Sequence, residues 1–130
     1  MRPLSFAVLG VGALLILGDG IVRETATAQD VTKVAPDKYK VLLENERVRV
    51  LEYRAKAGDK TPMHSHPAYL VHSLSSGKAK FTSPDGKTTE RDLKAGQVTW
   101  NEGETHASEN AGSTEAHVIL VELKEPPKTK

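Results

Sequence analysis

The apolar residues of this chain come in short runs separated by turn residues, and this pattern constrains the fold most. Between residues 39 and 123 no stretch has the periodicity of a long amphipathic helix. Eight runs can be placed, at residues 40–44, 48–54, 68–74, 79–82, 88–93, 97–100, 105–108 and 116–123. Short strands at such regular turn spacing are typical of an all-β sandwich or barrel. The pattern therefore predicts a single domain of eight or nine strands.

Two local signals refine this interpretation. Pro84-Asp85-Gly86 lies between two of the runs and predicts a hairpin turn. Within residues 48–54 the apolar positions change parity, because Val48 and Val50 share one face while Leu51 and Tyr53 share the other. Such a change suggests a β-bulge in this strand.

Residues 1–28 have the pattern of a secretory signal peptide. Arg2 precedes an uncharged apolar run over residues 4–17, and Ala26-Thr27-Ala28 is a small-x-small cleavage site before Gln29. The alternative is an uncleaved membrane anchor, but the run is shorter than the roughly 20 residues that a spanning helix needs. We therefore expect a periplasmic or secreted protein that is not held in a membrane after cleavage.

The rest of the chain divides into three parts. We expect residues 29–38 to form an arm that lies on the surface or is disordered, residues 39–124 to form the domain, and residues 125–130 to be a flexible tail. The chain has no cysteine, so no disulfide stabilises it. Its net charge of +1 gives no argument for binding nucleic acid or a charged membrane surface.

Three histidines form the candidate site. His64 and His66 stand two apart after Gly58-Asp59-Lys60-Thr61-Pro62, and in extended chain such residues project from the same face. A third, His106, lies in Gly103-Glu104-Thr105-His106. Imidazole is the commonest protein metal ligand near neutral pH. We predict that the three bind one metal ion, the alternative being solvated histidines in loops.

These residues resemble the first motif of the cupin family, a jelly-roll barrel also called the double-stranded β-helix. That motif runs Gly, five residues, His-x-His, three or four residues, Glu, six residues, Gly. The matching positions here are Gly58, His64, His66, Leu70 and Gly77. Every spacing fits, but Leu70 replaces the glutamate that is normally a metal ligand in the family.

The second cupin motif is matched less fully. Gly96, Gly103, His106 and Asn110 fit it, with Asn101 in place of proline and one residue fewer after Gly96. The resemblance implies a small cupin barrel with a three-histidine site. It is similar to the branch that includes thiol dioxygenases and acetylacetone-cleaving dioxygenases with mononuclear iron.

Three neutral imidazoles leave the double positive charge of a divalent ion uncompensated, so such a site favours an anionic or enolate ligand. Iron, zinc, manganese, nickel and copper all accept nitrogen ligands, and the sequence does not choose among them. The alternative is a cupin without metal that keeps its histidines as polar groups of the pocket. We expect apolar walls that include Leu70, Leu74 and Phe81.

Two further residues are candidates for catalysis. His72 follows Leu70 by two positions and on a regular strand would share its inward face, where it could shuttle protons. The alternative is a barrel-lining histidine bonded to a neighbour. Glu104 has the parity of His106 and could bring a carboxylate to the pocket rim, although a solvated charge is the usual role of glutamate.

Two functions follow from this site. The first is a metal-dependent, dioxygenase-like enzyme acting on a small bidentate substrate such as a diketone or a hydroxy acid. The second is a non-catalytic exported module that binds a metal or a small anion. In either case we expect a small-molecule ligand and a homodimer, because the sheets leave edges to cover.

Overall fold

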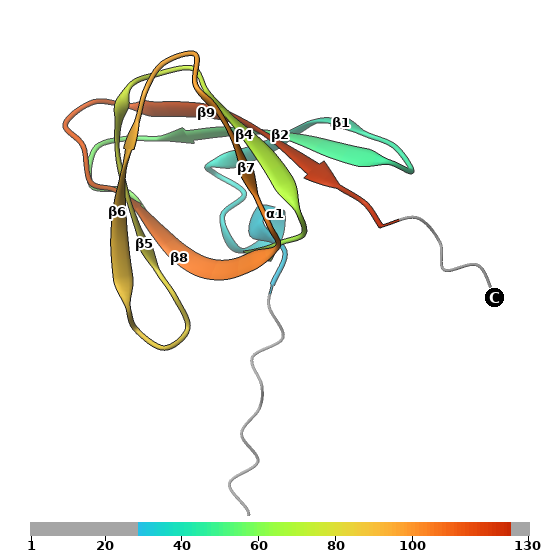
Figure 1. Cartoon of the computed structure of the whole chain (residues 1–130), viewed down its shortest axis with the longest axis horizontal. Coiled ribbons are helices and arrows are strands. Elements are labelled where there is room, and N and C mark those ends of the chain that lie inside the picture. Colours follow the sequence, from blue (N-terminus) through green and yellow to red (C-terminus); the bar gives the residue numbers. More distant parts are fainter. Residues whose placement is uncertain (1–28, 126–130) are drawn as a thin grey trace, which may run out of the picture.

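The computed structural model describes residues 29–125, which form one short helix and nine strands (Figure 1). Their bounds are α1 Val31–Val34, β1 Tyr39–Glu44, β2 Val48–Ala55, β3 Lys60–His66, β4 Tyr69–Ser73, β5 Gly77–Thr82, β6 Thr88–Leu93, β7 Val98–Asn101, β8 Glu104–Asn110 and β9 Ala116–Leu123. The predicted all-β fold is confirmed. The predicted signal peptide lies outside the described residues, as does all of the predicted tail except Glu125.

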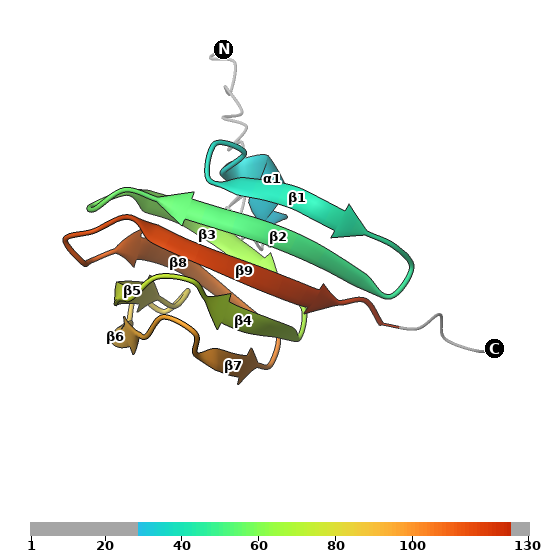
Figure 2. The same ribbon diagram turned by 90° about the horizontal axis from the view of Figure 1, so that it is seen from above.

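The strands form two antiparallel sheets that face each other (Figures 1 and 2). The first sheet has the order β1-β2-β9-β4-β7, and the second has the order β3-β8-β5-β6. Consecutive strands therefore often lie in different sheets, which is the winding of a double-stranded β-helix. Strands β6 and β7 end the two sheets on one side of the barrel, and β1 and β3 end them on the other.

Alternate residues of the central strands build the core. Leu51 of β2 pairs with Leu120 of β9, and both are buried on the inner face together with Val118. Tyr39 and Tyr69 complete this wall from β1 and β4. Because side chains of a strand alternate between faces, these positions also decide which residues of each strand can reach the interior.

The bulge predicted in residues 48–54 is in the neighbouring strand instead. Pairing of β2 with β9 is regular throughout, whereas the β1–β2 register shifts between Val41 and Leu43, leaving Leu42 as the extra residue. Val48 and Val50 are apolar but lie on the outer face of a regular strand. The change of parity reflects a strand with two apolar faces.

The N-terminal segment is not a loose surface arm. Val31 of α1 is fully buried, and Ala35 is 2% exposed in the same core cluster as Leu51. Asp30 caps the helix by accepting from the backbone N–H of Thr32 at 2.9 Å. The helix thus packs against β1 and β3, edge strands of the two sheets. Within residues 29–125, no helix is long and apolar enough to cross a membrane.

Candidate metal centre

The prediction that three histidines meet is confirmed. His64 and His66 project from β3, and His106 is the direct cross-strand partner of His64 on β8. One ring nitrogen from each histidine lies within 4.8 Å of the others, and all three side chains are buried. Two adjacent strands of the four-stranded sheet therefore supply the whole cluster.

A bulge in β3 places His64 on the inner face. Thr61 pairs with Ser108 and His64 pairs with His106, so β3 has one more residue than β8 between these two pairs. The extra length falls at Pro62 and Met63, which are both exposed, whereas Thr61 and His64 are buried. A bulge leaves one residue out of the hydrogen-bonded ladder. Proline is tolerated at such a position because the N–H that it lacks is not needed there. The bulge at Pro62 and Met63 thus determines that both His64 and His66 point to the inner face.

Hydrogen bonds at Nδ1 orient two of the three rings. His64 Nδ1 lies 2.7 Å from the carbonyl oxygen of Pro62, which can only accept, so Nδ1 carries the proton. His66 Nδ1 lies 2.7 Å from Glu122 Oε1. In the neutral rings the lone pair is then on Nε2, and His64 Nε2 is buried without any hydrogen-bond partner. A metal ion bound at this nitrogen would give the buried acceptor a partner.

The electrostatics keep the rings of His64 and His106 neutral. Burial lowers the pKa of His64 to about 4, although the hydrogen bond to Pro62 raises it. Burial, followed by the nearby charge of His64, lowers the pKa of His106 to about 4. At neutral pH both imidazoles are therefore unprotonated, which is the form that binds metal ions.

Glu104 lies beside the cluster, as its parity predicts. It is the cross-strand partner of His66, and its Oε1 lies 3.3 Å from His106 Nδ1 without hydrogen-bond geometry. Tyr69 donates its hydroxyl to the same oxygen at 2.5 Å. Burial and this hydrogen bond raise the pKa of Tyr69 far above its ordinary value, so the phenol keeps its proton. Glu104 is thus a partly exposed carboxylate fixed at the rim.

A chain of ion pairs behind His66 is the feature that sequence reasoning missed. Glu122 is buried and reaches His66 from the opposite sheet. Arg49 bonds the other oxygen of Glu122 at 2.7 and 2.8 Å, and also bonds Asp30 at 2.6 Å. Glu122 is the single acidic residue in the apolar run 116–123, and this was the available signal.

The structure corrects the expected positions of Leu70 and His72. Tyr69 and Ser73 of β4 are buried, and with Val71 they line the space between the sheets. Leu70 and His72 alternate with them and so point to the outer face. Leu74, also expected in the wall, is 41% exposed. The cupin glutamate position at Leu70 is therefore not directed at the three histidines, and neither is His72.

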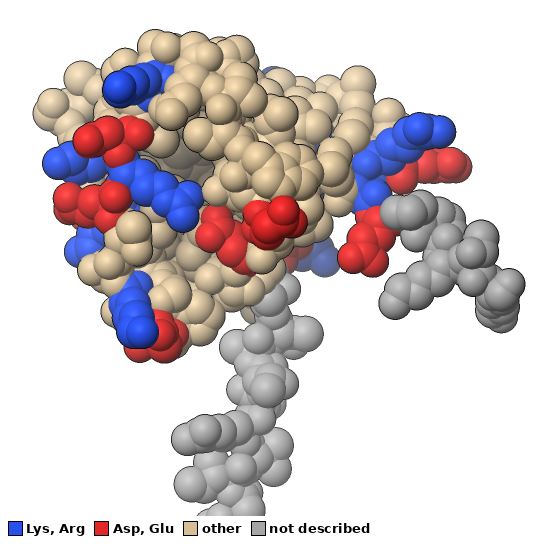
Figure 3. Space-filling view, viewed as in Figure 1, with Lys and Arg blue, Asp and Glu red and all other residues tan. Residues whose placement is uncertain are grey.

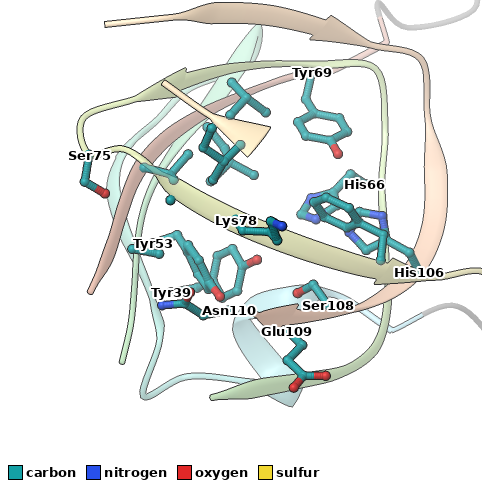
Figure 4. A pocket seen from close by; sticks show the side chains of 18 of the residues that line it. Tyr39, Tyr53, His66, Tyr69, Ser75, Lys78, His106, Ser108, Glu109 and Asn110 are labelled. Atoms are coloured by element: carbon teal, nitrogen blue, oxygen red, sulfur yellow. The ribbon is translucent and has the colours of Figure 1, made fainter. Parts of the chain in front are cut away.

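The space beside the histidines is a cavity of about 80 Å³ inside the barrel (Figure 4). His66 and His106 line one end, toward which the hydroxyl of Tyr69 points, and Tyr39 and Tyr53 lie at the other. The remaining wall is largely apolar, and it includes Val71, Ala79, Phe81, Leu93, Val118 and Leu120. Phe81, expected in this wall, packs at 4.9 Å between ring centroids against His106.

A wider groove of about 500 Å³ adjoins the cavity. The two share Tyr69, Val71, Phe81 and Leu93, so the groove forms the mouth of the cavity. Residues of β6 and β7, the strands that end the two sheets, line the groove. On this side of the molecule, Figure 3 shows a hollow surrounded by charged side chains of both signs.

Comparison with solved structures gives the same architecture. A cupin domain from Bordetella pertussis Tohama I is 30% identical, with a TM-score of 0.62 over 67% of this chain and 92% of that chain. An RmlC-like cupin with a double-stranded β-helix fold from Methanocaldococcus jannaschii is 17% identical, with a TM-score of 0.55 over 69% of this chain and 82% of that one.

A third solved structure shows the fold alone. The DMSP lyase DddQ from Ruegeria pomeroyi DSS-3 is 15% identical, with a TM-score of 0.51 over 73% of this chain and 51% of that chain. No family model matches the sequence, and no curated protein matches it.

Proposed function

This chain belongs to the cupin family, and we propose that it is a metal-dependent enzyme of dioxygenase-like activity on a small bidentate substrate. In this proposal His64, His66 and His106 hold one divalent ion, and a small anionic or enolate molecule binds beside it. The observation that carries the proposal is the buried Nε2 of His64, which has no partner and belongs to a cluster of three ring nitrogens within 4.8 Å.

The donor set fits such an ion. Three neutral imidazoles suit iron, zinc, manganese, nickel or copper, and they leave coordination positions open. When bound, the ion would supply Lewis acidity and a place for substrate and oxygen side by side. Because the three donors are imidazoles and none is a carboxylate, the donor set itself does not compensate the double positive charge of the ion, and this favours a substrate that binds as an anion.

The residues around the cluster have roles of their own in this proposal. The apolar cavity excludes water from the substrate and so strengthens the electrostatic interactions inside it. Glu104 accepts or returns a proton at its carboxylate oxygen, where Tyr69 already donates a hydrogen bond. His72 has no route to the cavity from the outer face, and we assign it no part in the reaction.

Metal analysis of the purified domain tests the binding step. We expect close to one divalent ion per chain, and its loss in the double variant His64→Ala/His106→Ala. The matched control is His117→Ala, because His117 bonds Glu52 on the outer face and lies away from the cluster. Equal and negligible metal in the parent and double-variant proteins would refute the proposal.

Oxygen uptake with a diketone panel tests the reaction. Protein loaded with iron(II) should consume oxygen with acetylacetone or a related compound, and the double variant should not. No turnover with iron, copper or manganese would leave the alternative, a non-catalytic module that binds a metal or a small anion. The cavity volume of about 80 Å³, which suits a ligand of few atoms, is the observation that favours this alternative.

The proposal includes export. The pattern of residues 1–28 is the argument for a periplasmic or secreted protein, with cleavage before Gln29. Mass spectrometry of the protein recovered from the exported fraction tests this. A mature chain that begins at Gln29 is expected, and a chain that begins well before it would contradict the assignment.

A further inference from the structure

We propose that Arg91, at the mouth of the cavity, recognises the carboxylate of a small organic acid whose other end binds the metal ion. This inference rests on the proposed function and names the class of its substrate.

The position follows from strand pairing. Arg91 is the cross-strand partner of Ala79, which lines the cavity, and cross-strand partners project from the same face of a sheet. Arg91 itself lines the wider groove that opens into the cavity. Its side chain thus starts from the inner face of the barrel at the open side, between β6 and β7.

Two contacts hold the guanidinium in place. Its Cζ lies 5.1 Å from the centroid of the Phe81 ring, and Phe81 in turn packs against His106. Its Nη1 donates to Asn101 Oδ1 at 3.2 Å, which joins β6 of one sheet to β7 of the other. The Phe81 ring therefore contacts both the Arg91 guanidinium and one histidine of the candidate metal cluster.

Arg91 forms no ion pair with any residue in the range 29–125. No carboxylate of this part of the chain lies within the 4.0 Å of an ion pair with Arg91. By contrast, Arg49 pairs with Asp30 and Glu122, and Arg54 pairs with Glu52 and Glu115. Arg91 is exposed at the mouth of the cavity, is held by two contacts and forms no ion pair, so it is suited to a ligand carboxylate, which its planar fork binds through two hydrogen bonds.

The probes are two diketones that differ by a carboxylate arm. Acetylacetone has the chelating oxygens alone, and 4,6-dioxoheptanoate has the same oxygens with a carboxylate two methylene groups away. Calorimetric titration of the zinc-loaded domain, which holds a redox-inactive ion, measures binding without turnover. We expect 4,6-dioxoheptanoate to bind about tenfold more tightly or better, since a charge-assisted bidentate pair is among the stronger hydrogen-bond arrangements.

The variants separate this role from a structural one. Arg91→Gln should remove the preference for 4,6-dioxoheptanoate while leaving the affinity for acetylacetone unchanged, and Arg91→Lys should retain part of it. The control Arg54→Gln, at an exposed arginine paired elsewhere, should change neither affinity. Equal affinities of the parent domain for both probes, or equal losses for both in Arg91→Gln, would overturn the proposal.

Zinc content measured on the same samples distinguishes a failure of the Arg91 proposal from a failure of the proposed metal site. Full zinc in every sample with no preference between the probes refutes the role of Arg91 alone. No zinc in the parent domain refutes the metal site, and this inference with it.

Discussion

The orientation of two imidazoles in the cluster depends on the hydrogen bond that Nδ1 makes. For His64 this is a backbone carbonyl, and for His66 it is the carboxylate of Glu122. Carboxylate partners of this kind fix the tautomer of a ligating histidine and raise its basicity. Glu122 thus places a negative charge one hydrogen bond away from the His66 ring. The three histidines themselves carry no negative charge.

The first prediction concerns this carboxylate. Glu122→Gln should weaken zinc affinity by about 10- to 100-fold, because the amide keeps the shape but loses the charge that polarises His66. Competition with a chromophoric chelator measures the affinity. The matched control is Glu52→Gln, since Glu52 contacts His117 on the outer face as Glu122 contacts His66 inside. A similar loss in both variants would contradict a specific role for Glu122.

The second prediction is a pH dependence of the metal-free domain. The pKa values of His64 and His106 are lowered to about 4 in the folded state, from the ordinary value of 6.5. Between these values the unfolded chain binds more protons than the folded chain, so the free energy of unfolding falls as pH drops. We expect a falling urea midpoint from about pH 6.5 to pH 4.

The variant His64→Gln should flatten that slope. Carboxylates contribute in the same range, and so the comparison is between variant and parent at each pH. A slope that is unchanged in the variant would show that His64 does not stay neutral in the folded state.

The histidines could be predicted from the sequence, but their partners could not. His64 and His66 are two apart, and local spacing alone puts them on one face of an extended strand. Glu122 and Arg49 come from strands of the opposite sheet, and Asp30 comes from the N-terminal segment. No local pattern connects residues that lie so far apart in the chain.

At the scale of elements, the N-terminal segment supports the strand that carries two of the clustered histidines. The carbonyl of Gln29 accepts from the N–H of Ser65 at 3.1 Å, and Asp30 forms a β-bridge to Ser65. Ser65 lies between His64 and His66. The segment therefore covers the edge of β3 at His64 and His66. Asp30 is also linked to His66 through Arg49 and Glu122.

The third prediction tests that support. Asp30→Asn should lower zinc affinity several-fold, because Arg49 loses a charge-assisted bond and holds Glu122 less firmly. The control Asp37→Asn removes a carboxylate from the same segment, where Asp37 pairs only with Lys38 at the surface. Calorimetric titration with zinc compares them. Equal affinities of the Asp30 variant and the parent would exclude a link between the segment and the site.

Strand positions were predicted better than strand faces. The eight predicted runs correspond to eight of the nine strands, with ends that differ by at most two residues. The inward face of β4 was assigned wrongly because the strand is apolar on both sides. Leu70 pairs with Trp100 and Val121 on the outer face, so its apolar character gave no guide to the interior.

At the scale of the molecule, an apolar row crosses the outer face of the five-stranded sheet and has no covering element in residues 29–125. One row of register partners crosses all five strands, and it comprises Leu43, Val50, Val121, Leu70 and Trp100. Trp100 is 52% exposed and Val98 beside it is 55% exposed. Contiguous exposed apolar surface usually marks an interaction site, and the expected homodimer would bury it.

The fourth prediction concerns this assembly. The parent domain should have the mass of a dimer by light scattering, and Trp100→Lys should shift it toward the monomer because a charge cannot be buried there without a partner. The control Met63→Lys changes an exposed apolar residue of the other sheet, and it should leave the mass unchanged. A parent domain that is monomeric at every concentration would contradict the expected dimer.

The central claim is that His64, His66 and His106 bind one metal ion together. X-ray absorption spectroscopy of the zinc-loaded domain tests it most directly. We expect three imidazole nitrogens around the zinc ion at about 2.0–2.1 Å, and two in the variant His106→Ala. A first shell of oxygen atoms alone, or a spectrum that His106→Ala leaves unchanged, would contradict it.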